Sequence, residues 1–138
     1  MDVLKVLKWS GLTGGIVYWL FVAWGGISRN GWFSFFHNAL SDLGDPPSEA
    51  TAPWIYNYGL IVTSIFVLAF AIYLLLNAKN KLKRLEGAYI SISAIFLALI
   101  GIFHGGTRPP HVFVSTYFFV QFFLGGAGLR CWKRDEGG

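Results

Sequence analysis

The stretch "ATAPWIYNYGLIVTSIFVLAFAIYLLLNA", residues 50–78, decides the fold, because no charged residue occurs between Glu49 and Lys79. An uncharged apolar run of about 18 residues or more can cross a bilayer as a helix. Similar runs lie between Lys8 and Arg29, between Glu86 and Arg108, and between Arg108 and Arg130. The sequence therefore predicts an all-α integral membrane protein, a four-transmembrane-helix bundle in one domain, residues 1–138. Its spans are expected at about 9–28, 54–77, 87–104 and 111–129.

The distribution of basic residues predicts the orientation of this bundle. Charged residues make up only 13% of the chain, which is about half of the usual share. Nine of the 11 lysines and arginines fall in the N-terminal segment, in the loop at 79–84 and in the tail at 130–134. In a four-span chain these segments share one side, and short basic segments stay in the cytoplasm. Both termini are therefore expected inside, and the net charge of +4 is explained without a nucleic-acid partner.

The segment between the first two spans, on the outer side, has a pattern typical of an amphipathic helix. At about 100° per residue, the apolar and polar residues of 32–43 fall on opposite halves of a helical wheel. The polar half contains Ser34, His37, Asn38, Ser41 and Asp42. Gly44 and the prolines at 46 and 47 are expected to end this helix. We therefore expect an amphipathic helix over about 32–43, lying along the outer membrane interface.

Candidate functional residues gather on the same outer side. His104 ends the third span and His111 begins the fourth, and the glycine- and proline-rich turn between them, which carries Arg108, should hold them within roughly 10 Å. Together with the first outer segment they supply a nucleophile, a base and an orienting carboxylate. The catalytic candidates are Ser41, Asp42, His111 and His37. A plainer interpretation stays open, in which these are a hydrated polar face and interfacial histidines bonded to turn carbonyl groups.

The same side chains also form a candidate metal site. His37, His104 and His111, with a carboxylate from Asp42 or Asp45, have the ligand types that zinc accepts. No compact spacing such as H-E-x-x-H is present. We therefore assign no metal and no cofactor from the sequence, and keep these residues as candidate ligands.

The interior of the predicted spans carries small and polar residues but no ionisable ones. Polar residues such as Asn57 and Ser115 lie at depth. Ion-coupled carriers usually have a carboxylate or a lysine there, so this interior disfavours such a carrier. Glycines at 11, 14 and 15 and at 125, 126 and 128 are expected to permit close approach between helices.

The segments "NALSDLGDP" at 38–46 and "GIFHGGTRPPHVFVSTYFF" at 101–119 carry a family resemblance. Together they resemble the prokaryotic multispan membrane family catalogued as domain of unknown function 998, over about residues 10–125. The residues that carry the resemblance are Ser41, Asp42, Leu43, Gly44, Gly101, Phe103, His111, Ser115, Phe118 and Phe119. With Arg108 of the intervening turn, we treat them as the structural motif. The resemblance implies a multi-pass protein of a prokaryotic cell membrane, in which Ser41, Asp42 and His111 form one unit, and it implies no particular reaction.

Two departures from the family pattern bear on assembly. Members usually carry proline and acidic residues where this chain has His104 and the glycines at 105 and 106. Members also usually have about six spans, and four are predicted here. The resemblance therefore implies a shortened member, or one completed by a partner, and we expect a homo-oligomer or a subunit of a larger membrane complex.

Three functions remain open from the sequence. The first is a small structural, accessory or lipid-interacting membrane subunit, with membrane lipids as partners. The alternative is an enzyme, such as a metal-assisted hydrolase, acting on a lipid headgroup at the outer surface through the catalytic candidates. The second alternative is an oligomeric transporter or channel.

Overall fold

The structure of the chain, a computed structural model, describes residues 2–27, 34, 36–44, 53–104 and 107–135, with the backbone alone over 128–135. Regular structure in these residues is helical throughout. The elements are α1 (Val3–Ile27), the 3₁₀ helix η1 (Leu40–Gly44), α2 (Pro53–Leu76), α3 (Lys81–Ile102) and α4 (Pro110–Asp135). The four long helices lie where four spans were predicted, so the all-α class is confirmed.

Local capping sets the ends of these helices. Pro53 begins α2, and proline is favoured at a first helical position because its missing N–H is not needed there. Asn80 caps α3, since its Oδ1 accepts the backbone N–H of Lys83 at 2.9 Å. After α3, the Thr107 hydroxyl donates to the His104 carbonyl oxygen at 2.8 Å. The chain can therefore reverse within a few residues between α2 and α3 and between α3 and α4.

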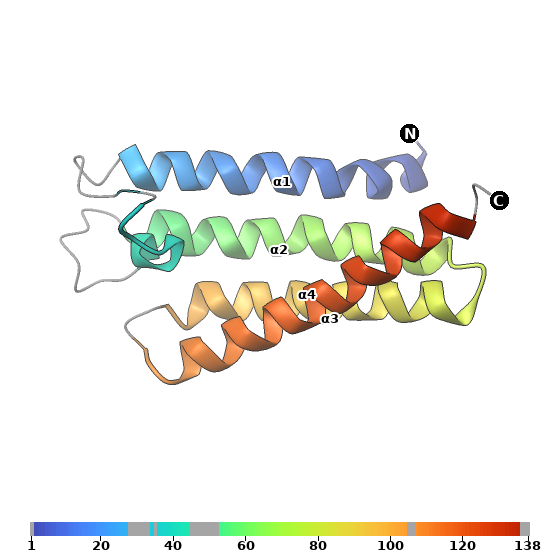
Figure 1. Ribbon diagram of the computed structural model, residues 1–138. Coiled ribbons are helices and arrows are strands. Elements are labelled where there is room, and N and C mark those ends of the chain that lie inside the picture. Colours follow the sequence, from blue (N-terminus) through green and yellow to red (C-terminus); the bar gives the residue numbers. More distant parts are fainter. Residues whose placement is uncertain (1, 28–33, 35, 45–52, 105–106, 136–138) are drawn as a thin grey trace.

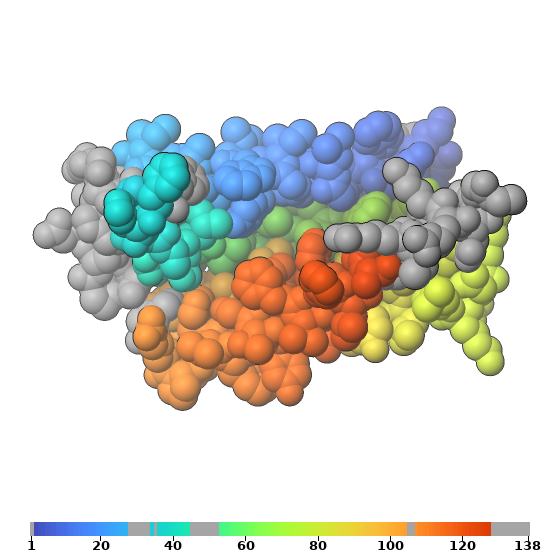
Figure 2. All heavy atoms as spheres, viewed as in Figure 1, coloured from blue at the N-terminus to red at the C-terminus, as the bar shows by residue number. Residues whose placement is uncertain are grey.

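The long helices run up and down in chain order (Figure 1). Helix α1 packs on α2, α2 on α3, and α3 on α4, whereas α1 and α4 do not form a packed pair in the part of the chain that the structure describes. Helix α4 crosses α3 obliquely, and α2 remains visible between α1 and α4 (Figures 1 and 2). We call the end of the bundle that carries η1 the η1 end. The N-terminus, the turn between α2 and α3 and the last turns of α4 lie at the opposite end.

The outer surface of the bundle is apolar. Within the described chain, α1, α2 and α3 are long and apolar enough to cross a membrane. Large apolar side chains such as Leu20, Ile65 and Phe123 are exposed, and soluble proteins rarely expose extended apolar surfaces. These are the features of a membrane protein. Helix α4, with 26 residues, is also long enough to cross, and its role as a fourth span stays a prediction.

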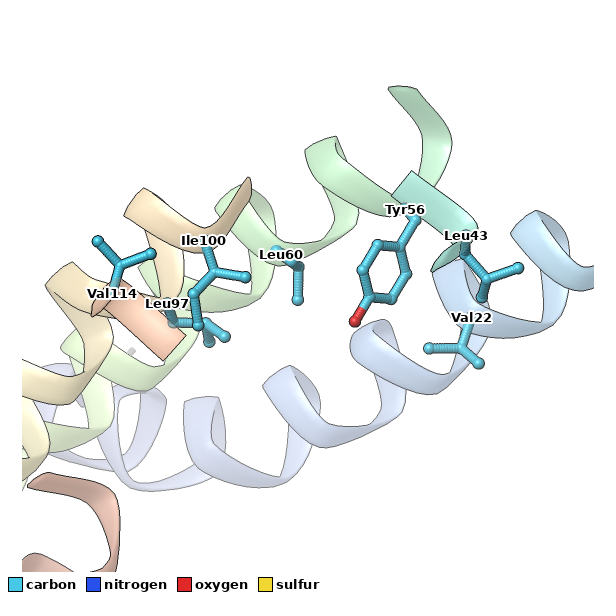
Figure 3. Packing of buried hydrophobic residues seen from close by; sticks show 7 residues of the cluster. All are labelled: Val22, Leu43, Tyr56, Leu60, Leu97, Ile100 and Val114. Atoms are coloured by element: carbon cyan, nitrogen blue, oxygen red, sulfur yellow. The ribbon is translucent and has the colours of Figure 1, made fainter. Parts of the chain in front are cut away.

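The main hydrophobic core lies toward the η1 end and joins all five elements. It consists of Val22, Leu43, Tyr56, Leu60, Leu97, Ile100 and Val114 (Figure 3). The Tyr56 ring extends from α2 toward α1 in this view. Leu43 is only 1% exposed, and the partly buried Leu40 packs on the same core, so these two side chains attach η1 to the bundle by apolar contact. A second, smaller cluster of Ala71, Leu74 and Ile90 joins α2 to α3 nearer the opposite end.

The predicted amphipathic helix over 32–43 is wrong in the part of it that the structure describes. Residues 36–38 form a turn and a bend, and helical structure begins only at Leu40; residues 32, 33 and 35 lie outside the described chain. The cause is local. Asn38 Oδ1 accepts the Ser34 N–H at 3.0 Å, and Asp42 Oδ2 accepts the Ala39 N–H at 2.8 Å. Such side-chain bonds to the backbone compete with helical hydrogen bonds, so polar residues assigned to one helix face fold the segment into turns instead.

Candidate functional site

A cavity of about 860 Å³ lies between α1 and α4, with η1 at one end and α2 and α3 forming the rest of its wall. Its volume is within the range of small-molecule sites in proteins. Along α2 it reaches from Tyr56 to Phe70, a distance of about 21 Å at the helical rise per residue. The cavity is therefore long relative to its volume.

The polar side chains of this cavity lie between its η1 end and its middle, which Thr63 marks on α2. They belong to Tyr18, Ser41, Tyr56, Thr63, His111 and Ser115. Toward the opposite end the lining consists of apolar residues and glycines, among them Gly11, Phe70, Ile90 and Gly126. We call the first part the polar end and the second the apolar end. The cavity is thus amphipathic along its length.

Helix α4 presents one face to the cavity. The face contains His111, Ser115, Phe118, Phe122 and Gly126, which are three or four residues apart and therefore lie on one side of a helix. Phe113 and Val120, outside this face, are exposed. The aromatic residues of this helix are therefore divided between the cavity and the outer surface of the bundle.

In two pairs of adjacent glycines, the first glycine packs against a neighbouring helix and the second lines the cavity. A Cβ on Gly14 would lie 2.9 Å from Phe66 Cβ, and one on Gly125 would lie 2.6 Å from Ile90 Cδ1. These two glycines permit close helix packing, as predicted. A Cβ on Gly15 or Gly126 would meet nothing within 4 Å, and both residues line the cavity. The second glycine of each pair therefore leaves space open.

Two glycines of the structural motif, Gly44 and Gly101, pack against Asn57 of α2. The Asn57 side-chain Nδ2 donates to the Gly44 carbonyl oxygen at 3.0 Å. A Cβ on Gly44 would collide with the Asn57 side chain, and a Cβ on Gly101 would lie 2.6 Å from the Asn57 carbonyl oxygen. Gly44 and Gly101 are distant in sequence, yet both pack against Asn57 so closely that neither position has room for a side chain. Sequence reasoning identified Asn57 only as a polar residue at depth.

Other residues of the structural motif are joined through the His111 ring. Nδ1 of His111 lies 2.6 Å from the Phe103 carbonyl oxygen, and Nε2 lies 3.5 Å from the Ser115 hydroxyl oxygen. The plainer interpretation, a histidine bonded to a turn carbonyl group, is correct for one of its two nitrogens. His111 and Ser115 line the polar end of the cavity together with Ser41. The structure therefore brings Ser41 and His111 to one site, and it adds Ser115.

The other candidate residues lie apart from this site. His37 is exposed and His104 is partly buried, and Nδ1 of His104 has no hydrogen-bond partner among the described residues. Asp42 accepts the Ala39 N–H, and Arg108 is exposed on the turn before α4. No group of three histidine, cysteine or acidic side chains close enough to hold a metal ion is found in the described chain. Asp45 and the glycines at 105 and 106 lie outside it.

Sequence reasoning missed three further polar residues of the cavity. Thr63 is 4% exposed, and its hydroxyl has no hydrogen-bond partner among the described residues. The side chains of Tyr18 on α1 and Tyr56 on α2 are close enough to interact across the two helices. Helical periodicity does not distinguish a residue that faces a cavity from one that faces a neighbouring helix. No sequence signal therefore singled these residues out.

Comparison with known proteins confirms the family resemblance. Neither the curated proteins nor the solved structures give a match to this chain. A family model described as "Protein of unknown function (DUF998)" matches residues 12–138. That range contains η1, α2, α3, α4 and most of α1, and it includes every residue on which the resemblance depends. The chain therefore belongs to the DUF998 family of proteins of unknown function.

Proposed function

We propose that this protein is a four-span membrane protein that binds an amphipathic lipid in the cavity between α1 and α4. The observation that carries the proposal is the division of this one cavity into a polar and an apolar end. An amphipathic lipid has the same division along its length. The proposal develops the expectation of a lipid-interacting subunit and gives the lipid a place.

The cavity is open on its side as well as amphipathic. Leu12 of α1 and Phe119 of α4 both line it, and they are 59% and 67% exposed. Because the described residues of α1 and α4 do not form a packed pair, the opening between these helices would face acyl chains in a bilayer. A lipid chain could then enter from the membrane without passing through water.

The polar end is the source of selectivity in this proposal. Lipid tails are as apolar as the wall of the cavity, so apolar contact alone gives little preference for the cavity over the bilayer. The side chains of Ser41, His111 and Ser115 are partly exposed and line the polar end. A ligand with polar atoms there could form hydrogen bonds with them. The preferred ligand should therefore have an ester or hydroxyl group close to the start of its chain.

The orientation of the bundle supports the placement of the headgroup. Lys79 and Lys81 lie at the opposite end from η1 (Figure 1), and basic segments favour the cytoplasmic side. The η1 end would then be at the outer face of the membrane. The lipid headgroup would lie at that face, with the tail extending toward the membrane centre.

The test is photo-crosslinking with a lysophosphatidylcholine that carries a diazirine in its acyl chain, using protein in liposomes. The double variant Gly15→Leu/Gly126→Leu fills the cavity at two positions where a side chain has space. Crosslinking should fall about tenfold, equivalent to about 1.4 kcal/mol of binding free energy. The matched control is Ala127→Leu, because Ala127 is exposed and does not line the cavity. Equal crosslinking in wild type, control and double variant would refute the proposal.

A further inference from the structure

The Ser115 hydroxyl has a partner that differs from those of other hydroxyls in the helices. Most of the described helical hydroxyls donate to a carbonyl oxygen of their own helix, as in Ser10, Thr13, Ser64, Ser91, Ser93 and Thr116. Ser115 Oγ instead lies 3.5 Å from Nε2 of His111, one helical turn away. Its hydroxyl is therefore directed at a base.

The other nitrogen of His111 fixes the state of the ring. Nδ1 lies 2.6 Å from the Phe103 carbonyl oxygen. A carbonyl oxygen only accepts hydrogen bonds, so Nδ1 carries the hydrogen and Nε2 of the neutral ring presents its lone pair to Ser115. The carbonyl group thus orients the imidazole, which is the part that a carboxylate takes in serine hydrolases. A separation of 3.5 Å between nucleophile and base is long, and such contacts commonly tighten when the substrate binds.

The pair lies where an ester and water can both reach it. His111 and Ser115 belong to the polar end of the cavity, and Ser41 adds a second hydroxyl there. Arg108 and Pro109, directly before α4, are exposed, so water can approach from the η1 end. The apolar end extends away from Ser115 along the same face of α4. An acyl chain in the apolar end would therefore have its carbonyl group near Ser115.

We propose that Ser115 is the nucleophile, and His111 the general base, of a site that hydrolyses the ester of a single-chain lipid. This inference rests on the proposed lipid binding, which supplies the substrate. Ser115 Oγ attacks the ester carbonyl carbon and its proton passes to His111 Nε2. The bond between that carbon and the alcohol oxygen then breaks, and His111 returns the proton to the departing alkoxide. Water, deprotonated by His111, next attacks the carbonyl carbon of the acyl-serine ester. The bond between that carbon and Ser115 Oγ breaks, and His111 returns the proton to Oγ, which releases a fatty acid and restores Ser115.

The test is covalent labelling with a long-chain alkyl fluorophosphonate, which reacts with activated serines by displacement of fluoride. The wild type should form an adduct on Ser115, identified by peptide mass spectrometry. Ser115→Ala should form none, and His111→Ala should label about 100-fold more slowly, as expected for the loss of a general base. Thr116→Ala is the matched control, because this neighbouring hydroxyl donates to the Val112 carbonyl oxygen of its own helix. It should label as the wild type does.

Photo-crosslinking of the same variants separates this inference from the proposed function. Ser115→Ala should lose the adduct entirely but only part of its crosslinking to the lysolipid, because Ser115 is one of several polar residues at the polar end. The crosslinking that remains shows that the variant is folded. If the wild type crosslinks the lipid but forms no adduct on Ser115, or if His111→Ala labels at the wild-type rate, the catalytic inference is overturned and lipid binding stands. If the adduct forms on Ser115 but filling the cavity changes nothing, the lipid-binding proposal fails.

Discussion

Adjacent glycines make a test of cavity and packing at the scale of single residues. Gly14 faces Phe66, whereas Gly15 faces open space in the cavity. Overpacking a tight contact is destabilising by about 1–3 kcal/mol, whereas replacing an unconstrained helical glycine with alanine is stabilising by about 0.5–1 kcal/mol. Gly14→Ala should therefore lower the melting temperature in detergent, and Gly15→Ala should leave it unchanged or raise it. The reverse order would contradict the assignment of these two positions.

Gly44 and Asn57 should depend on each other energetically. A side chain on Gly44 would collide with the Asn57 side chain, which also donates to the Gly44 carbonyl oxygen. Gly44→Ala and Asn57→Ala should each destabilise the protein by about 1–3 kcal/mol. Gly44→Ala introduces a methyl group that would collide with the Asn57 side chain, and Asn57→Ala removes that side chain. The double variant should therefore lose less stability than the two single variants together, with a coupling energy of about 0.5 kcal/mol or more.

A double-mutant cycle of melting temperatures measures this coupling. Asn77→Ala is the control. Asn77 directly follows α2, and its side chain donates at 2.9 Å to the Tyr73 carbonyl oxygen one turn earlier, at an exposed position. It should have a small effect, and Gly44→Ala with Asn77→Ala should be additive. Additivity in the Gly44 and Asn57 cycle would show that the two residues do not meet.

At the scale of elements, Leu43 is the one apolar side chain of η1 that is fully buried, and the partly buried Leu40 packs on the same core. Leu43 is 1% exposed and Phe36 is 95% exposed. Leu43→Ala should therefore destabilise the protein by about 2–5 kcal/mol, and Phe36→Ala should have almost no effect on the melting temperature in detergent. Comparable losses of stability in the two variants would contradict this assignment and support the amphipathic helix that the sequence pattern predicted.

The difference between η1 and the long helices shows what the sequence could predict. The four helices follow from uncharged apolar runs, whose length alone determines them in a membrane, and their order places Ser41, His104 and His111 at one end. The turns at 36–39 depend on side-chain bonds to the backbone from Ser34, Asn38 and Asp42, which a helical wheel does not represent. The cavity depends on how α4 crosses α3, and no residue pattern specifies that angle. Ser41 and His111 could therefore be predicted as neighbours, whereas Tyr56, Thr63 and the role of Ser115 could not.

At the scale of the whole molecule, the bundle is open between its first and last helices. Each helix packs on its neighbour in sequence, and among the described residues α1 and α4 do not form a packed pair. The contacts of α2 with α1 and α3 hold the wall of the cavity, so a ligand between α1 and α4 would add contacts without displacing any. Ligand binding should therefore stabilise the protein, in proportion to the logarithm of ligand concentration above the dissociation constant.

The orientation of this bundle in the membrane determines whether the polar end of the cavity faces the outside of the cell or the cytoplasm. The test replaces one exposed residue at each end by cysteine, one at a time, in a Cys131→Ser background. Phe36 is exposed at the η1 end, and Lys79 is exposed at the opposite end. A membrane-impermeant maleimide should label Phe36→Cys in intact cells, because the proposed topology places the η1 end outside. Lys79→Cys should be labelled only after the membrane is permeabilised. The opposite pattern would put His111 and Ser115 at the cytoplasmic face, so the lipid would have to come from the inner leaflet.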